Sequence, residues 1–183
     1  MKIIEPSVEL IDEIDSDAVL KKIERCGRVC YQSSPKNAEG FVRMLIKRGH
    51  ESVLEHVSLT FHIICDRAIQ NELVRHRLAS FSVESTRYVK YDELTLINPP
   101  PHHNFAENNY RDLIQQDYPP EQARAVLPLC LKSELYMTAN LREWRHIIKL
   151  RTSKHAHPQM RLVVGMIRDI LKEKLPVIVE DLS

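Results

Sequence analysis

The stretch RHRLASFSVESTRY, residues 75–88, gathers side chains that could hold an anion. It brings the guanidinium groups of Arg75, Arg77 and Arg87 together with His76 and three serines. A guanidinium is planar and carries several N–H donors, which suits it to phosphate groups. A charge run of this kind is more often a solvated helix face followed by a polar loop, so the rest of the sequence must decide between the two interpretations.

A second group of basic side chains lies in the C-terminal part of the chain. It comprises Arg142, Arg145, His146, Arg151, His155, His157 and Arg161. Because the formal net charge of the whole chain is only +1, a general nucleic-acid binder is not expected. Two basic clusters in a nearly neutral chain instead favour binding of more than one phosphorylated small molecule. The alternative is that these arginines pair with nearby carboxylates such as Glu143, and that Trp144 is plain core.

The glycine content narrows how phosphate could be bound. The chain has four glycines, and neither GxGxxG nor GxxxxGK[ST] can be written anywhere in it. Side chains, and arginine above all, must therefore bind the phosphate groups that the backbone of a glycine-rich loop binds in other proteins. From the residues alone, a nucleotide enzyme and an anion-regulated binding or assembly protein both remain open.

Metal binding and thiol chemistry are poorly supported. HESVLEH is not the HExxH of a zinc protease, because His50 and His56 are six residues apart. The adjacent His102 and His103 lack further ligands at a fixed spacing, so no metal site is predicted. The four cysteines form no CxxC pair, which predicts reduced, mostly structural thiols.

Hydrophobic periodicity predicts the elements that position these clusters. It predicts helices over residues 16–31, 38–48, 67–79, 119–127, 140–151 and 158–175. It predicts strands over residues 57–64 and 131–139, an extended segment over 81–91 and an excursion loop over 98–110. The helix over 67–79 would carry RHR in its last turns.

These elements predict an α+β (α/β) fold, with a small sheet flanked by helices. The length predicts a single domain over residues 1–183. No apolar run is long enough to span a bilayer, and the acidic N-terminal stretch does not resemble a secretory signal. We therefore expect a cytoplasmic protein with no membrane partner.

RHRLASFSVES resembles the signature of the flavin-dependent thymidylate synthases, in which RHR is followed by seven residues and a serine, here Ser85. GHESVLEH, residues 49–56, resembles the upstream histidine block of the family, and ARAVLP carries its central arginine as Arg124. NLREWRHIIKLRTSKHAHPQMR, residues 140–161, resembles its C-terminal segment. The resemblance runs from about Cys26 to Pro176.

The resemblance implies reductive methylation of dUMP to dTMP. Methylenetetrahydrofolate would donate the one-carbon unit, and FAD reduced by NADPH would supply the hydride. No enzyme cysteine attacks the uracil in this family. The resemblance also implies a homotetramer whose active sites are shared between subunits, with dUMP and folate as ligands.

Residue roles follow from the resemblance by position. The residues implied to bind FAD are His50, Ser52, Arg75, His76, Arg77, Asn140, Arg142 and His146. Those implied to bind dUMP are Glu72, Arg75, Glu84, Ser85, Thr86, Arg87, Arg124 and Arg151. Arg151 is implied to contact the uracil ring, where a guanidinium would stabilise developing negative charge, and it is the predicted catalytic residue. Ser85 has no nucleophile elbow around it, so substrate positioning is the better interpretation of its role.

The chain departs from the family pattern at a few positions. Ser82 and Val83 stand where many members carry Asn-Glu, and the carboxylate appears at Glu84 instead. Glu72 occupies a position that is often glutamine, and His146 one where some members use asparagine. Two alternatives are kept: a related pyrimidine hydroxymethylase, and a non-catalytic nucleotide-binding flavoprotein.

Overall fold

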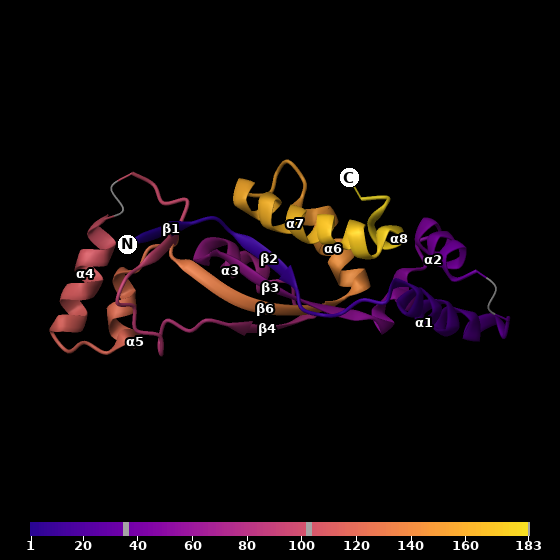
Figure 1. Ribbon diagram of the computed structural model, residues 1–183, viewed down its shortest axis with the longest axis horizontal. Helices are drawn as coiled ribbons and strands as arrows, with labels where there is room; N and C mark the ends of the chain where they lie inside the picture. The colour runs from indigo at the N-terminus through magenta and orange to yellow at the C-terminus, as the bar shows by residue number, and fades with distance from the viewer. Residues whose placement is uncertain (35–36, 102–103, 183) are drawn as a thin grey trace. The chain divides into compact units, whose positions relative to one another are not determined.

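The chain folds into a mixed α+β arrangement, as predicted (Figure 1). The computed structural model describes residues 1–34, 37–101 and 104–182. The strands are β1 Lys2–Ile4, β2 Ser7–Leu10, β3 Ser58–Asp66, β4 Ala79–Val83, β5 Thr95–Ile97 and β6 Lys132–Asn140. The α-helices are α1 Ser16–Arg28, α2 Ala38–Lys47, α3 Arg67–Leu73, α4 Asn104–Gln115, α5 Pro120–Ala123, α6 Leu141–Arg151, α7 Pro158–Lys174 and α8 Pro176–Val179. The 3-10 helices are η1 Val29–Tyr31, η2 Glu51–His56 and η3 Arg124–Val126.

The residues cluster into two compact units. Unit 1 comprises Met1–Ser7, Ile63–Arg75 and Phe81–Tyr136, and unit 2 comprises Val8–His62, His76–Ser80 and Met137–Ser183. One boundary lies between Arg75 and His76, and the others fall inside the strands β2, β3, β4 and β6, which form one four-stranded sheet in the order β2-β3-β6-β4.

Unit 1 contains a short parallel strand pair and the helices α3, α4 and α5. Strands β1 and β5 pair in the register Lys2↔Thr95, Ile3↔Leu96 and Ile4↔Ile97. Beside them a buried cluster forms the core, and helix α4 contacts α5 and η3. The buried members of that cluster are Leu94, Leu96, Tyr110, Ala123 and Leu131.

Unit 2 holds the remaining long helices. Helices α1 and α2 lie side by side, and α7 packs against both α6 and α8 (Figure 1). Trp144 of α6 is fully buried, its ring meets Phe61 edge-on at 4.9 Å, and its indole N–H donates to the Leu59 carbonyl at 3.0 Å. Trp144 is therefore core, which fixes α6 against the sheet.

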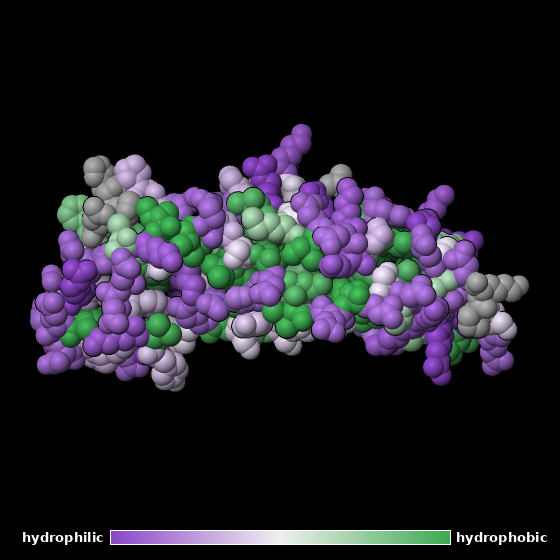
Figure 2. Space-filling model, in the orientation of Figure 1, coloured by the Kyte–Doolittle hydropathy of each residue, from purple (hydrophilic) through white to green (hydrophobic). Residues whose placement is uncertain are grey.

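Strand β3 alternates as a strand with one buried face should. Leu59, Phe61 and Ile63 are buried, whereas Thr60 and His62 between them are half-buried. On the face drawn in Figure 2, hydrophobic side chains gather over the strands of the sheet, and hydrophilic side chains cover the outer surfaces of α1 and α2.

Helix starts follow the capping chemistry of the sequence. The side-chain oxygens of Asp15, Asn37, Asp66 and Asn140 each accept a backbone N–H near the start of α1, α2, α3 and α6. Such caps satisfy N–H groups that have no partner inside the helix. Helix α2 is followed by Gly49, whose φ of +72° is the left-handed conformation that glycine adopts without strain.

The predicted helix over residues 67–79 was wrong in its second half. Helix α3 ends at Leu73, so Arg75, His76 and Arg77 lie in a turn and connection that lead into β4. The physical reason is the alternation of Ala79, Phe81 and Val83 with serines, which favours a strand and requires a non-helical connection before it.

The predicted loop over residues 98–110 was also wrong in part, because helix α4 begins at Asn104. Its polar, asparagine-rich start masked the helical spacing of the apolar side chains that follow. His102 and His103, weighed as metal ligands, lie outside the described residues. The N-terminal strands β1 and β2 and the short β5 were not predicted.

Two further features bear on the expected class of protein. None of the helices in the described part of the chain is long and apolar enough to cross a membrane. Cys26, Cys30, Cys65 and Cys130 are free thiols, as predicted.

Candidate active site

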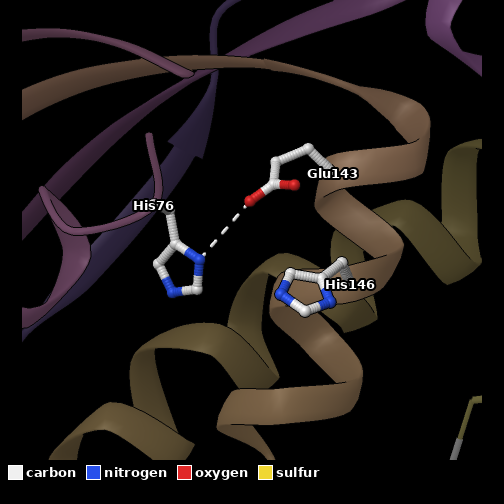
Figure 3. Close-up of side chains that lie close together, drawn as sticks. All are labelled: His76, Glu143 and His146. Carbon is white, nitrogen blue, oxygen red and sulfur yellow. Dashed lines mark ion pairs between the residues drawn. The ribbon is translucent and has the colours of Figure 1, made fainter. Parts of the chain in front are cut away.

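His76 lies at the centre of a cluster in unit 2. It comes from the connection before β4, while Glu143 and His146 project toward it from α6 (Figure 3). Glu143 Oε1 lies 3.4 Å from His76 Nδ1, and the rings of His76 and His146 meet edge-on with centroids 6.1 Å apart. His76 and Glu143 are buried, whereas His146 is exposed.

On the other side of the His76 ring lies the predicted catalytic arginine. Arg151 Nε donates a hydrogen bond to His76 Nε2 at 3.0 Å. A guanidinium has no acceptor, so Nε2 must be the acceptor and the imidazole must be unprotonated there. The four remaining N–H donors of Arg151 sit on its two terminal nitrogens.

The surroundings keep His76 neutral. Burial, then the positive charge of Arg151, then that of His146 lower the pKa of His76 from 6.5 to about 4. Burial also raises the pKa of Glu143, against the opposing effects of His146 and Arg142. A neutral ring that accepts at Nε2 carries its single proton on Nδ1, where it faces the Glu143 carboxyl group.

A cavity of about 1170 Å³ opens beside this cluster in unit 2. Its lining includes Leu78, Asn140, Arg142, Glu143 and His146. Pockets for small molecules usually measure roughly 300–1,000 Å³, so the cavity has room for a dinucleotide.

The donors on the cavity wall fit an anionic cofactor such as FAD. Arg142 is half-exposed and pairs with Glu55 at 2.5 Å, so its guanidinium is held at the wall by a surface ion pair that a phosphate could replace or share. Asn140 uses Oδ1 to accept the Glu143 N–H at 2.9 Å, which leaves its amide NH₂ as the donor for a ligand.

Arg145 has a different role from its neighbours on α6. It is buried, it pairs with Glu51 at 3.0 Å and Asp181 at 2.6 Å, and it donates to the Ile178 carbonyl. These contacts tie α6 to η2, to α8 and to the segment after α8. For Arg145 the structural interpretation of the basic cluster is therefore correct.

The other predicted flavin residues of unit 2 are exposed. His50 directly follows Gly49, Ser52 lies in η2, and Arg77 directly follows His76. The left-handed backbone at Gly49 turns the chain from α2 into η2 and so sets where His50 and Ser52 lie. The ion pair, the hydrogen bond and the ring contact described above for the His76 side chain are all with residues of α6.

In unit 1, Glu84 is the centre of a half-buried network. Its carboxylate accepts from Lys132 Nζ at 2.7 Å and from the Tyr91 hydroxyl at 2.6 Å, and Lys132 also contacts Glu134 at 2.8 Å. Burial, then the bond to Glu84, raises the pKa of Tyr91. Glu84, predicted to contact substrate, is thus held in place by protein partners.

The predicted phosphate ligands of unit 1 sit at its surface. Arg87 contacts Glu121 at 3.6 Å, and Glu121 lies three residues before Arg124, the spacing of side chains on one helical face. The Ser85 hydroxyl accepts the Arg87 N–H at 3.3 Å. Thr86 is buried, so its side chain is part of the packing under this loop.

The predicted residues therefore divide between the two units. Glu72, Arg75, Glu84, Ser85, Thr86, Arg87 and Arg124 belong to unit 1. His50, Ser52, His76, Arg77, Asn140, Arg142, His146 and Arg151 belong to unit 2. All but one of the implied dUMP ligands fall in the first set, and all but one of the implied flavin ligands fall in the second.

Sequence reasoning treated Glu143 only as a pairing partner for arginine. One signal could have marked it: it lies three residues before His146, the spacing of side chains on one helix face.

Comparison with known proteins identifies the family of the chain. The family model described as thymidylate synthase complementing protein matches residues 9–177. The flavin-dependent thymidylate synthase of Corynebacterium diphtheriae is 31% identical over 91% of this chain and 79% of its own length. A probable flavin-dependent thymidylate synthase of Mycobacterium phage D29 is 35% identical over 87% of this chain and 81% of its own. The flavin-dependent thymidylate synthase of Mycobacterium bovis is 33% identical over 85% of this chain and 77% of its own length. The chain thus belongs to the family of the flavin-dependent thymidylate synthases.

Proposed function

We propose that this protein catalyses the reductive methylation of dUMP to dTMP, with methylenetetrahydrofolate as one-carbon donor and NADPH as the reductant of bound FAD. The observation that carries the proposal is the hydrogen bond between Arg151 and His76. It joins the RHR motif to the C-terminal segment, which are 75 residues apart in sequence. These are the two segments on which the family resemblance chiefly depends.

The residues of unit 2 suit the binding of FAD. Arg142 would neutralise phosphate charge, the Asn140 amide would donate to a polar edge of the cofactor, and the exposed imidazole of His146 would line the cavity. Reduced flavin supplies the hydride equivalent for the reaction.

Arg151 is proposed to act on the pyrimidine. A guanidinium beside the uracil ring stabilises negative charge that develops as C5 becomes nucleophilic. Because the Arg151 Nε is bound to His76, the plane of the guanidinium is fixed and the terminal N–H groups are the ones that would meet the ring. A group held in place before the reaction costs no reorganisation during it.

The experiment that tests this function follows the visible spectrum under anaerobic conditions. FAD is added to the purified protein, NADPH is added next, and dUMP with methylenetetrahydrofolate last. Flavin bands that bleach with NADPH and return without oxygen, with dTMP formed in equal amount, are the expected result. A protein that binds no added FAD would contradict the proposal.

An Arg151→Ala variant separates catalysis from binding. We expect it to bind FAD and to form dTMP at least about a hundredfold more slowly, the usual effect of removing one such electrostatic group. A variant with normal dTMP formation would remove Arg151 from the mechanism. Product analysis with dUMP and dCMP in competition separates thymidylate synthesis from the related hydroxymethylation, because that enzyme would release a hydroxymethylated pyrimidine.

We also propose a homotetramer with active sites built from more than one subunit. Leu78 is 73% exposed directly after the RHR motif, and Tyr88 is 78% exposed directly after Arg87. Large apolar side chains that open to water next to binding residues are typical of surfaces that a further subunit covers.

A further inference from the structure

We propose that Glu143 is a positioning residue, which orients His76 so that His76 in turn holds Arg151 in its reactive geometry; this inference rests on the function proposed above. The three side chains form a chain of contacts inside unit 2, from carboxyl group to imidazole to guanidinium. Figure 3 shows the first of these contacts, between Glu143 and His76. Nothing in the family resemblance assigns a role to Glu143.

The distance between Glu143 and Arg151 along α6 explains why a third residue is needed to link them. Glu143 lies in the first turn of α6 and Arg151 at its last residue. Eight residues at about 1.5 Å each separate them by roughly 12 Å along the helix axis. His76 enters from another part of the chain and contacts both, so it links the two ends of the helix through one ring.

The position of the ring proton on His76 determines which partner each ring nitrogen can bind. Since Nε2 accepts from Arg151, the proton must be on Nδ1, and Glu143 Oε1 is 3.4 Å from that nitrogen. The Nδ1–H tautomer is the less common form of histidine in water, so an acceptor beside Nδ1 is what would select it. Contacts of this kind are often long before substrate binds and tighten in the complex.

Burial gives the contact its strength. His76 and Glu143 are 6% and 8% exposed, so neither exchanges its partner for water freely. Without Glu143 the buried Nδ1–H would lose the acceptor beside it, and the ring would gain by moving its proton to Nε2. That change removes the acceptor of Arg151.

A metal centre is the competing explanation of the same cluster. His76, Glu143 and His146 bring ligand atoms within 4.8 Å of one another, which a divalent cation could bridge. Coordination through His76 Nδ1 would, however, push the ring proton onto Nε2, where it would meet the Arg151 N–H head-on at 3.0 Å. The hydrogen bond to Arg151 therefore favours the positioning role over a metal site.

The first test reads the tautomer of His76 by nitrogen NMR on protein labelled with ¹⁵N-histidine, with the His76 signals assigned from a His76→Gln variant. We expect the proton on Nδ1 in the wild type and its loss from Nδ1 in Glu143→Leu. An unchanged tautomer in Glu143→Leu would overturn the proposal. This readout needs no enzymatic activity, so it is valid even if the protein makes no dTMP.

The second test is kinetic. Glu143→Leu should lower kcat and kcat/KM for dUMP together by about tenfold to a hundredfold, because it acts on a group used in the transition state. With FAD at a saturating concentration, its rate of flavin reduction by NADPH should stay within about twofold of the wild type, as expected if the change acts on the transition state of the later step. Glu143→Gln keeps an acceptor oxygen and should recover most of the lost rate.

The control variant lies in the same unit. Glu173→Gln removes an exposed carboxylate on α7 that forms an ion pair with its neighbour Lys174, and it should have wild-type kinetics. Equal losses in Glu143→Gln and Glu143→Leu, or loss of flavin in both, would show that Glu143 merely supports the fold. Visible absorption bands of Co²⁺ bound to the wild type and absent in His146→Ala would establish the metal centre and overturn the proposal.

Discussion

At the scale of single residues, the site depends on a histidine that is kept neutral. Burial and the charges of Arg151 and His146 lower the pKa of His76 to about 4. The unfolded chain, in which histidine titrates near 6.5, therefore takes up a proton between pH 6.5 and about 4 that the folded chain does not. The stability that the neutral His76 contributes to the folded state is fully present above pH 6.5 and is lost as the pH falls toward 4.

We predict that His76→Gln reduces this acid sensitivity. The free energy of unfolding of the wild type should fall, relative to that of the variant, by up to about 3 kcal/mol between pH 6.5 and pH 4. Urea denaturation at a series of pH values measures the difference, and carboxylates that titrate in both proteins cancel. Parallel curves for the two proteins would show that His76 does not titrate differently in the folded state.

Ser85 gives a second prediction at this scale. Its hydroxyl accepts the Arg87 N–H, so it shapes the loop that carries a predicted phosphate ligand. Ser85→Ala should weaken dUMP binding by about tenfold, the worth of one hydrogen bond near a charge, and should leave measurable turnover. Calorimetric titration with dUMP together with dTMP assays measures both. Complete loss of turnover with unchanged dUMP affinity would instead favour a nucleophile.

At the scale of elements, one side chain at the start of α6 has two separate tasks. Asn140 caps the helix through Oδ1 and is predicted to contact FAD through its amide. Asn140→Asp keeps the capping oxygen but loses the N–H donor. It also adds a negative charge two residues before Arg142, which is proposed to bind a phosphate group of FAD. We predict unchanged thermal stability and a tenfold or greater loss of FAD affinity, which fluorescence titration measures.

Asn37→Asp is the matched control for this change. Asn37 caps α2 in the same unit through the same atom, which accepts the Gly40 N–H at 2.9 Å, and it lies outside the cavity lining. It should change neither stability nor FAD affinity. If both variants lower FAD affinity alike, the effect comes from altered caps and not from a contact with the cofactor.

The elements also show which parts of the fold can be predicted from the sequence. Helices α1, α2, α6 and α7 were predicted because each buries one apolar face, and periodicity records such a face directly. The short strands β1 and β5 could not be predicted in this way, since three residues give no periodicity and their pairing joins distant parts of the chain. Helix α3 was extended too far because helical spacing and strand alternation overlap where RHR begins.

The family resemblance supplies Arg151 and His76 as candidate site residues by position. It does not supply their contacts. Their hydrogen bond to each other depends on the path of the connection before β4, about which periodicity says nothing. Glu143 was missed for the same reason. Its spacing to His146 indicates a shared face of α6, but its contact with an imidazole from another part of the chain cannot be read from the local sequence.

At the scale of the whole molecule, the predicted site residues belong to two compact units. The proposed homotetramer allows a test of whether one active site takes these residues from different subunits. Arg151 belongs to unit 2 and Arg87 to unit 1. If each active site takes these residues from different subunits, an Arg151→Ala chain and an Arg87→Ala chain can complement each other.

We predict that the two inactive variants regain activity when they are unfolded together and refolded. Random assembly would leave about a quarter of the sites with both arginines intact, so about a quarter of the wild-type rate is expected. Sedimentation should give four times the chain mass of 21.3 kDa for each sample. A mixture that stays inactive as a tetramer would mean that both arginines of a site come from one subunit.

Helix α6 carries Asn140 at its cap and Arg142, Glu143, His146 and Arg151 along its length. Inserting one residue between Trp144 and Arg145 would turn the second half of the helix by about 100° against the first. Trp144 could then keep its place in the core only if His146 and Arg151 left theirs. Substitutions can therefore accumulate along this helix over evolution, but changes in its length cannot, and length variation among functional relatives should fall in the connections on either side of it.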